Sequence, residues 1–327
     1  MKTVLITGGT GFIGSNLAAA LSADGCNVRL LRRPSSDLFN VRSLSVEHRI
    51  GDVRDPASLR DAVRGCDTVF HTAAMVSFWK PARELQYEIN VLGTRNVVQA
   101  CLQENVERLV HTSSIAAIGH AANGKLADES TAFNWLQENA GYKYSKHMAE
   151  AEIAKGVEEG LNAVMVNPGV VIGPGDVHFN GGKLIRSVKN HQALFYIEGG
   201  MNVVYVADVV KGHIEAALKG RTGERYILGG ENLTHKQAFQ VTAEVVEGIV
   251  PRIKMPVQFV KIAGTLFDLA GMIMNKEPFV TSELFSGAGL YNWYSSDKAK
   301  RELGYTITPF REAVERTYQW YCDNHLL

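Results

Sequence analysis

The sequence predicts an α/β protein with a doubly wound parallel sheet and a smaller, mostly helical second region. Short runs of β-branched residues alternate with helix-length amphipathic segments through the first half, which is the pattern of repeated βαβ units. A glycine-rich turn joins the first of these runs to the first helical segment. After Asn167 this alternation gives way to a stretch rich in proline and glycine, which indicates that a second region begins there.

The individual elements follow from the hydrophobic spacing. Strands are expected over residues 3–7, 27–31, 46–50, 68–71, 108–112 and 163–166, and helices between them over 12–23, 57–63, 84–103 and 143–157. Strand and helix patterns return over 203–226. Further helices are expected from residue 234, near 257 and over 309–321. We therefore expect a Rossmann-type sheet domain over 1–167 and about 202–230, interleaved with a substrate-binding domain over about 168–201 and 231–327.

Composition excludes several classes of protein. The 327 residues include 34 Lys and Arg and 34 Asp and Glu, so the net charge is zero and the strong positive field of a nucleic-acid binder is missing. The 4 cysteines are far apart and the 10 histidines show no metal-ligand spacing, so we expect neither disulfides nor a metal site. These features predict a cytoplasmic protein whose partner is a small molecule.

Two apolar segments are candidates for a signal peptide or a membrane span. The N-terminal run reaches glycines after a few apolar positions, which is too short for a signal peptide, so it is interpreted as the first strand. The segment 257–274 is interrupted by Gln258, Lys261 and Asp268, which is costly for a spanning helix. We expect no membrane span there, and favour a lid helix packed over the substrate domain above a helix lying at a membrane surface.

The glycine-rich turn, residues 7–14, has the chemistry of a phosphate-binding loop. It lies between a strand and a helix, where a helix N-terminus offers free N–H groups and the positive end of its dipole. Gly8 permits the tight turn, Gly11 lets the backbone approach a phosphate, and Gly14 lets helix and strand pack closely. Phe12 and Ile13 supply backbone groups at the helix start, so the turn predicts a bound dinucleotide.

The end of the second strand bears on which dinucleotide is bound. Arg32 and Arg33 follow this strand, at the place where an NAD-binding chain usually has an acidic residue for the ribose hydroxyl. A guanidinium suits a 2′-phosphate, so NADP(H) is favoured over NAD. The other expected cofactor contacts are Asp52 and Val53 after the third strand, beside the adenine, and Thr72, Ala73 and Ala74 after the fourth, under the cofactor.

A tyrosine and a lysine four residues apart predict proton-transfer chemistry. Tyr142 and Lys146 share one face of a helix, where an ammonium would favour the phenolate. A tyrosine of reference pKa about 10 could then exchange protons near neutral pH, as reduction of a carbonyl or oxidation of a hydroxyl requires. Ser114, just past the fifth strand, can donate a hydrogen bond to the same substrate oxygen, whereas Tyr144 has Met148 four positions on and suits the task less well.

The chain resembles the extended short-chain dehydrogenases/reductases of the NAD-dependent epimerase/dehydratase type. The matching motifs occur in order: TGGTGFIG at 7–14, GDVRD at 51–55, FHTAA at 70–74, NVLGTRN at 90–96, VHTSS at 110–114, YKYSK at 142–146 and NPG at 167–169. The second half resembles the dihydroflavonol-reductase-like branch at 203–213, 223–230, 276–281 and 297–305, although Ala207 stands where many relatives have an acidic residue.

This resemblance implies roles for particular residues. The catalytic set would be Ser114, Tyr142 and Lys146, with Asn90 holding the helix that faces the site. Ser114 is preferred to Ser113 because it stands five residues before Gly119, the position that the family's active hydroxyl normally takes. Tyr142 and Lys146 would also contact the cofactor, Lys146 at the nicotinamide ribose, and Pro168 is expected beside it. A homodimer through the helices near Asn90 and Tyr142 is implied as well.

The expected substrate contacts lie on three loops. They are Met75, Ser77, Phe78 and Trp79 after the fourth strand, the segment 133–141, and Phe179 and Asn180 in the loop that begins at His178. Many of these side chains are apolar or aromatic, which suits a flat or lipophilic ketone. A nucleotide-sugar would need cations for a second pyrophosphate, and Lys183, Arg186, Lys189, Arg252 and Lys254 could supply them or be ordinary surface charges.

Three functions fit these observations. The first is an NADP(H)-dependent oxidoreductase that reduces a ketone or aldehyde, or oxidises the corresponding alcohol, with a Ser-Tyr-Lys apparatus. The second is a nucleotide-sugar epimerase or dehydratase that keeps NAD tightly bound, and the third is a non-catalytic NADP-binding regulatory protein. Net consumption of NADPH, isomerisation of a nucleotide-sugar, or indifference to loss of the Tyr142 hydroxyl would separate them.

Overall fold

A seven-stranded parallel sheet forms the centre of the protein, with the strands in the order β10-β6-β5-β4-β1-β2-β3. The computed structural model describes residues 1–122, 124–136, 141–278 and 280–327. The strands are β1 (Thr3–Thr7), β2 (Asn27–Arg32), β3 (Glu47–Ile50), β4 (Thr68–His71), β5 (Arg108–Thr112), β6 (Ala163–Pro168) and β10 (Arg225–Leu228). Strand order reverses between β1 and β4, and ligands of such sheets bind beyond the carboxyl ends of the strands at this point.

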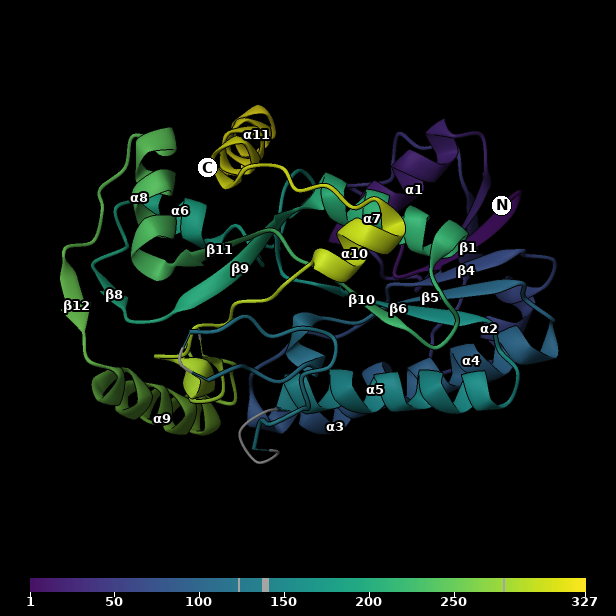
Figure 1. Cartoon of the computed structure of the whole chain (residues 1–327), viewed down its shortest axis with the longest axis horizontal. Helices are drawn as coiled ribbons and strands as arrows, with labels where there is room; N and C mark the ends of the chain where they lie inside the picture. The colour runs from purple at the N-terminus through teal and green to yellow at the C-terminus, as the bar shows by residue number, and fades with distance from the viewer. Residues whose placement is uncertain (123, 137–140, 279) are drawn as a thin grey trace.

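Helices cover both faces of this sheet (Figure 1). On one face lie α1 (Phe12–Ala23) and α7 (Val206–Lys219), and on the other α2 (Pro56–Val63), α4 (Gly93–Gln103) and α5 (Gly141–Glu158). Alternate strand residues face the two layers: Val4 and Ile6 belong to the core under α1 and α7, whereas Leu5 belongs to the core under α4 and α5. The inner strands β1, β4 and β5 are therefore buried on both faces, whereas the edge strand β3 is polar and largely exposed.

The second region combines helices with two small sheets. The sheets contain β7 (Val170–Ile172), β9 (Gly200–Tyr205) and β11 (Glu231–Thr234), and separately β8 (Phe195–Ile197) and β12 (Ile253–Met255). The helices are α6 (Lys183–Lys189), α8 (His235–Val246), α9 (Val257–Met274), α10 (Asp297–Leu303) and α11 (Phe310–Asp323). Figure 1 shows α8 and α9 at the end of the molecule away from the central sheet, whereas α10 packs on α7 and β10.

The predicted Rossmann-type sheet is confirmed, with three differences in detail. A seventh parallel strand, β10, pairs with β6, while β9 belongs to the smaller sheet, so the chain returns to the central sheet only at α7. The predicted mostly helical second region contains five short strands, because runs of three to six residues such as β7 and β8 pair with segments distant in sequence.

The third difference concerns the expected helix over 84–103. It is divided into α3 (Arg83–Tyr87), a π-helical turn η2 (Glu88–Leu92) and α4. The turn contains Asn90, whose side chain is buried and hydrogen-bonded to neighbouring elements. Single π-helical turns within α-helices often mark functional positions, and this one lies beside the predicted catalytic helix α5.

Candidate active site

The glycine-rich turn folds as a close contact between β1, α1 and the end of β4. Gly8 has φ +69°, and a Cβ there would lie 2.7 Å from the backbone of Ala73. A Cβ on Gly14 would lie 2.4 Å from the carbonyl oxygen of Gly8 and 2.8 Å from Oγ1 of Thr72. The left-handed backbone and the lack of space explain why glycine is required at these two positions.

This turn leaves the start of α1 open for a ligand. Gly11 is the N-cap residue, and among the described residues no side chain caps this end and no acidic residue occupies the first turn. The N–H of Gly11 donates to Gly8 O at 3.0 Å, which closes the turn. An uncapped helix start with a glycine cradle fits the pyrophosphate of a dinucleotide, with Phe12 and Ile13 supplying the exposed N–H groups.

Two arginines lie where β2 ends, beside the end of β3. Arg32 is half-buried and donates to Nδ1 of His48 at 3.3 Å, while Arg33 is exposed. Asp52 hydrogen-bonds the Arg54 side chain, which lowers the pKa of its carboxyl, and Arg33 adds a smaller electrostatic effect in the same direction. Val53 packs in the core under α4, so the backbone rather than its side chain is available to a ligand.

The end of β4 is held against the glycine-rich turn by hydrogen bonds. Thr72 donates from Oγ1 to Thr7 O at 2.7 Å, and the Ala73 N–H donates to Oγ1 of Thr7 at 3.4 Å. Ala74 follows and is exposed. The predicted cofactor residues of β1 and β4 are therefore adjacent, although the sequence separates them by about sixty positions.

Ser114 and Tyr142 come together at the carboxyl end of β5. Ser114 precedes the short helix η3 (Ile115–Ala117), accepts from the Ala116 N–H at 3.1 Å, and lies near enough to the Tyr142 hydroxyl to lower its pKa. Tyr142 is the second residue of α5, and its ring meets the Phe78 ring edge-on with centroids 5.6 Å apart. A serine and a tyrosine hydroxyl thus converge on one point, as a site that binds a single substrate oxygen requires.

The protonation of Tyr142 differs from the expectation. Burial of the hydroxyl raises the pKa of Tyr142 to about 12, and the hydrogen bond from Ser114 opposes this rise only in part. The expected lowering by Lys146 is not found, because the Lys146 ammonium is directed to the Thr112 carbonyl, to which it donates at 2.8 Å. Tyr142 therefore holds its proton at neutral pH.

Lys146 is a buried cation in the same site. Burial lowers the pKa of Lys146 to about 8, and the carboxylate of Glu150 acts in the opposite direction. Tyr142, Lys146 and Glu150 follow one another at intervals of four residues, so they share one face of α5. Two buried imidazoles, His71 and His111, lie close enough to Lys146 for its charge to contribute to their lowered pKa values.

Asn90 ties three elements together. Its Oδ1 accepts from the Met75 N–H at 2.7 Å, and its Nδ2 donates to Met75 O and to Oγ of Ser145, both at 2.9 Å. The loop after β4, the π-helical turn and α5 are therefore held in register. In this structure Asn90 is a positioning residue, because its partners are the supports of the site and not its reacting groups.

Glu150 and Asn167 form a buried support that the sequence motifs did not reveal. Glu150 accepts from Oγ of Ser113 and from Nδ2 of Asn167, each at 2.6 Å, and pairs with Arg225 at 3.2 Å. Asn167 also donates to Ser114 O at 2.9 Å. Ser113 is thus engaged with Glu150, which leaves Ser114 as the hydroxyl beside Tyr142. The four-residue spacing after Lys146 is the signal that could have identified Glu150.

The loop after β4 lies beside Tyr142. Phe78 contacts its ring, Met75 is held by Asn90, and Ser77 donates to Oε1 of Glu277 at 3.0 Å. Trp79 is half-buried. In the predicted segment 133–141, Phe133 stacks on His147 and Trp135 packs under the Lys143 ammonium, whereas 137–140 lie outside the described residues.

In the third predicted substrate loop, the aromatic side chain packs into the protein core and does not face a ligand site. The Phe179 ring is buried and stacks on Tyr321 of α11 with centroids 4.6 Å apart, so its observed role is packing. Asp176 closes this loop by accepting from the N–H groups of Asn180, Gly181 and Gly182. Asn180 is exposed and lines a separate apolar pocket between β7, β9 and α6. Pro168 ends β6 and is buried.

The C-terminal region also reaches the start of α5. Oε1 of Glu283 accepts from the Tyr142 N–H at 2.9 Å, and Oε2 forms an ion pair with Arg83 at 2.7 Å. The side chain of Glu283 is almost completely buried. A carboxylate at a helix start is favoured by the exposed N–H groups and the dipole, so this residue supports the start of α5.

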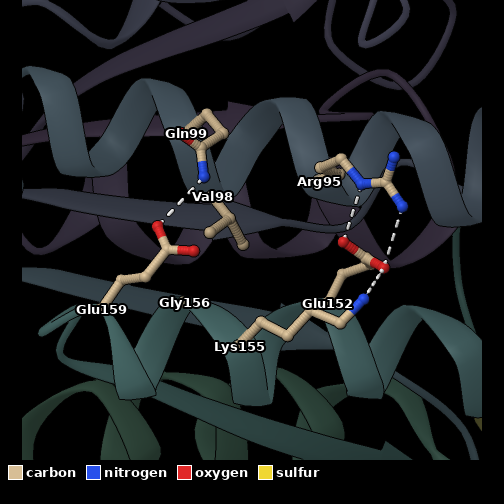
Figure 2. Close-up of a pocket in the computed structure, with 7 residues that line it drawn as sticks. All are labelled: Arg95, Val98, Gln99, Glu152, Lys155, Gly156 and Glu159. Atoms are coloured by element: carbon tan, nitrogen blue, oxygen red, sulfur yellow. Dashed lines mark hydrogen bonds and ion pairs between the residues drawn. The ribbon is translucent and has the colours of Figure 1, made fainter.

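A shallow polar pocket lies between α4 and α5, away from this site. Figure 2 shows that Glu152 joins Arg95 and Lys155 there, and the lining contains none of the predicted catalytic residues. The predicted homodimer through these helices stays a prediction. Within the part of the chain that the structure describes, no cluster of three or more histidine, cysteine or acidic side chains could hold a metal ion.

Comparisons with known proteins agree with this geometry. Residues 4–229 match the model of the NAD dependent epimerase/dehydratase family. A protein of Synechocystis sp. provisionally named dihydroflavonol 4-reductase is 34% identical, and the match covers 98% of this chain and 94% of the relative. Sterol demethylase protein B of Methylococcus capsulatus is 30% identical over 99% of this chain and all of the relative.

A solved structure extends the likeness to a cofactor complex. The UDP-glucose 4-epimerase of Thermus thermophilus, solved with NAD, is 26% identical, with a TM-score of 0.77 over 98% of this chain and 99% of that one. The family resemblance predicted from the motifs is confirmed. The chain belongs to the NAD-dependent epimerase/dehydratase family of extended short-chain dehydrogenases/reductases, whose members use a nicotinamide cofactor to act on a hydroxyl or carbonyl group.

Proposed function

We propose that this protein is an NADP(H)-dependent oxidoreductase that reduces a lipophilic ketone or aldehyde to the alcohol. The observation that carries the proposal is the position of Ser114 beside the Tyr142 hydroxyl at the carboxyl end of β5, with the buried Lys146 one turn further along α5. Reduction needs a proton donor at the carbonyl oxygen, and the protonated hydroxyl of Tyr142 is such a donor.

The side chains then divide the work at the carbonyl. Ser114 donates a hydrogen bond to the carbonyl oxygen and polarises it, and Tyr142 transfers its proton to that oxygen as negative charge develops. Lys146, one turn further along α5 and held by the Thr112 carbonyl, would contact the nicotinamide ribose, and a proton from solvent restores the Tyr142 hydroxyl after the transfer. Asn90 and Glu150 keep the loop after β4 and the carboxyl end of β5 in place during the reaction.

The glycine-rich turn and the ends of β2 and β4 would hold the nicotinamide cofactor. The cradle at Gly8 and Gly14 and the open start of α1 fit its pyrophosphate. When bound, the reduced nicotinamide supplies a hydride to the carbonyl carbon. Arg32 and Arg33 favour NADPH, because a guanidinium can pair with a 2′-phosphate through two parallel hydrogen bonds.

Two features support a lipophilic substrate. Phe78 places an apolar ring beside Tyr142, and Met75 and Trp79 belong to the same loop. The names of two relatives, a dihydroflavonol 4-reductase and a sterol demethylase protein, refer to polycyclic molecules. The alternative, a nucleotide-sugar epimerase or dehydratase with tightly bound NAD, is favoured by the likeness to UDP-glucose 4-epimerase. Two cations that it could use are partnered elsewhere, since Arg186 lies over the Phe179 ring and Lys254 pairs with Glu198.

A substrate survey tests the proposed function. The purified protein is incubated with NADPH and a panel of polycyclic and long-chain ketones, and in parallel with UDP-, dTDP- and GDP-sugars. We expect stoichiometric NADPH consumption with at least one ketone, and alcohol as the product. Isomerised or dehydrated nucleotide-sugar without net NADPH consumption would contradict the reductase and establish the alternative.

Replacing Arg32 with alanine tests the cofactor preference. In the Arg32→Ala variant we expect the Kd for NADPH to rise by about tenfold or more, because a charge-assisted hydrogen bond of about 1.5–3 kcal/mol is lost. The Kd for NADH should stay within about twofold, since NADH has no 2′-phosphate to lose. Fluorescence titration measures both constants, with Arg42→Ala as a nearby surface control. Equal losses for the two cofactors would refute the role of Arg32.

A further inference from the structure

The helix α9 has an unusual distribution of side chains for a helix at the surface of a folded protein. Val260, Gly264, Asp268 and Gly271, at spacings of four and three, form its buried side. Ile262, Leu266, Leu269 and Ile273 have the same spacing on another side, which we call the outer stripe, and all four are exposed. Surface helices normally bury large apolar residues and expose small or charged ones. In α9 the distribution is the opposite, with glycines buried and large apolar side chains exposed.

The outer stripe is a continuous apolar surface. Leu266 is 62% exposed and Ile273 is 80% exposed, and Phe259 beside the stripe is exposed as well. Among the described residues, α9 is the one helix that is long and apolar enough to cross a membrane. Only 22% of it is buried in the protein, so most of its apolar surface is uncovered. A contiguous exposed patch of this kind marks a surface that another body covers.

Contacts on its buried side keep α9 lying flat on the protein. A Cβ on Gly264 would meet the Ser282 backbone at 3.0 Å, so the helix touches the following segment closely. Oδ2 of Asp268 accepts from the Ser282 N–H at 3.1 Å and from its hydroxyl. Insertion across a bilayer would break this packing and move a carboxylate into hydrocarbon, which excludes a spanning position.

The charges around α9 identify its partner. From residue 252 to 277 the exposed charged side chains are Arg252, Lys254, Lys261 and Lys276 and one carboxylate, Glu277. Lys254 is paired with Glu198, so the cationic border consists of Arg252, Lys261 and Lys276. Glu277 accepts a hydrogen bond from Ser77, and the carboxylate of Asp268 faces inward. In a twofold contact between copies, this cationic border would face itself, whereas the surface of an anionic bilayer would attract it.

We propose that α9 seats this protein on the surface of a membrane that contains anionic lipid, with the outer stripe in the interfacial layer and the helix parallel to the bilayer. Apolar helices with cationic borders bind membranes in this way. This position of α9 also suggests where the substrate comes from, and that suggestion alone rests on the proposed reductase function. The segment that supports α9 continues to Glu277 and Glu283, which contact Ser77 and the Tyr142 N–H, so the active site is close to the membrane surface and a lipid-dissolved ketone can reach it.

Flotation with lipid vesicles tests whether the protein binds a membrane surface, and it needs neither cofactor nor substrate. We expect the wild-type protein to float with vesicles of phosphatidylcholine and phosphatidylglycerol, and much less with phosphatidylcholine alone or at high salt. Leu266→Gln should lower the partition coefficient by about tenfold, because a leucine side chain leaves the apolar layer. Leu218→Gln on α7 is the matched control, since Leu218 is 60% exposed far from α9 in sequence and should leave binding unchanged.

Each other outcome contradicts the proposal. Wild-type protein that stays unbound with both vesicle types overturns it. Equal losses in Leu266→Gln and Leu218→Gln show unspecific adsorption, and a dimer that Leu266→Gln converts to a monomer, with flotation unchanged, assigns the stripe to a second copy. Flotation and NADPH consumption are separate measurements, so the seating and the proposed reaction can fail independently.

Discussion

Tyr142→Phe is expected to lower kcat for ketone reduction by about 10²–10⁴-fold, the usual contribution of a positioned general acid. The substitution removes the hydroxyl that lies beside Ser114 and keeps the ring that meets Phe78. The Kd for NADPH should change little, because the pyrophosphate cradle lies on the glycine-rich turn. Single-turnover kinetics and a cofactor titration separate the two effects.

The same helix supplies a matched control for this experiment. Tyr144→Phe removes a hydroxyl from a half-buried tyrosine two residues along α5, and the activity should be retained. Unchanged activity in Tyr142→Phe would refute the catalytic assignment. If neither variant nor the wild-type protein turns over any substrate while NADPH binds, the non-catalytic regulatory function is favoured instead.

The protein is expected to lose stability steeply as the pH falls below about 6.5, the ordinary pKa of histidine. Burial lowers the pKa of His71 to about 3 and that of His213 to about 4, and it holds the pKa of His111 well below its usual range. In this interval the unfolded chain binds protons that the folded chain does not. Stability is therefore complete above about pH 6.5 and declines below it.

The expected size of this effect is large. From pH 7 to pH 5 each buried imidazole contributes about 2 kcal/mol, so three contribute about 6 kcal/mol, against a typical total stability of about 5–15 kcal/mol. Urea unfolding at a series of pH values measures the free energy directly. The interval above pH 5 lies above the ordinary pKa of Asp and Glu, so these carboxyl groups contribute little there.

A single substitution checks the origin of the pH dependence. Both ring nitrogens of His111 are buried without a hydrogen-bond partner among the described residues, so His111→Leu removes a titrating group and breaks no observed hydrogen bond. We expect this variant to lose about one third less free energy between pH 7 and pH 5. The exposed His178 is replaced in the control, His178→Leu. An identical pH dependence in all three proteins would refute the attribution to buried imidazoles.

Local patterns predicted the central sheet because each strand and helix there is specified within its own segment. The inner strands of the first half, β1, β4 and β5, are buried on both faces, and the glycine-rich turn marks the first crossover. The small sheets were not predicted, since β7 and β9 are short and become strands only by pairing with each other. Nor did helical periodicity reveal the π-helical turn at Asn90, which fits the same apolar spacing as a continuous helix.

The candidate site divides in the same way. Motif spacing predicted Ser114, Tyr142 and Lys146 as one catalytic set, and in the structure Ser114 lies beside the Tyr142 hydroxyl; their catalytic roles stay a prediction. The raised pKa of Tyr142 depends on burial, which spacing does not report. Similarly, the aromatic character of Phe179 suggested a ligand contact, but Tyr321, 142 positions later, occupies its face.

Glu283 limits how freely the parts of this protein can be exchanged. It belongs to the C-terminal third, outside residues 4–229 that match the family model, yet its carboxylate accepts from the Tyr142 N–H and pairs with Arg83. A chimera that keeps the N-terminal sheet and takes the remaining chain from a relative must therefore supply an equivalent carboxylate at this point. Exchanging the C-terminal region would therefore also exchange part of the support for the start of α5.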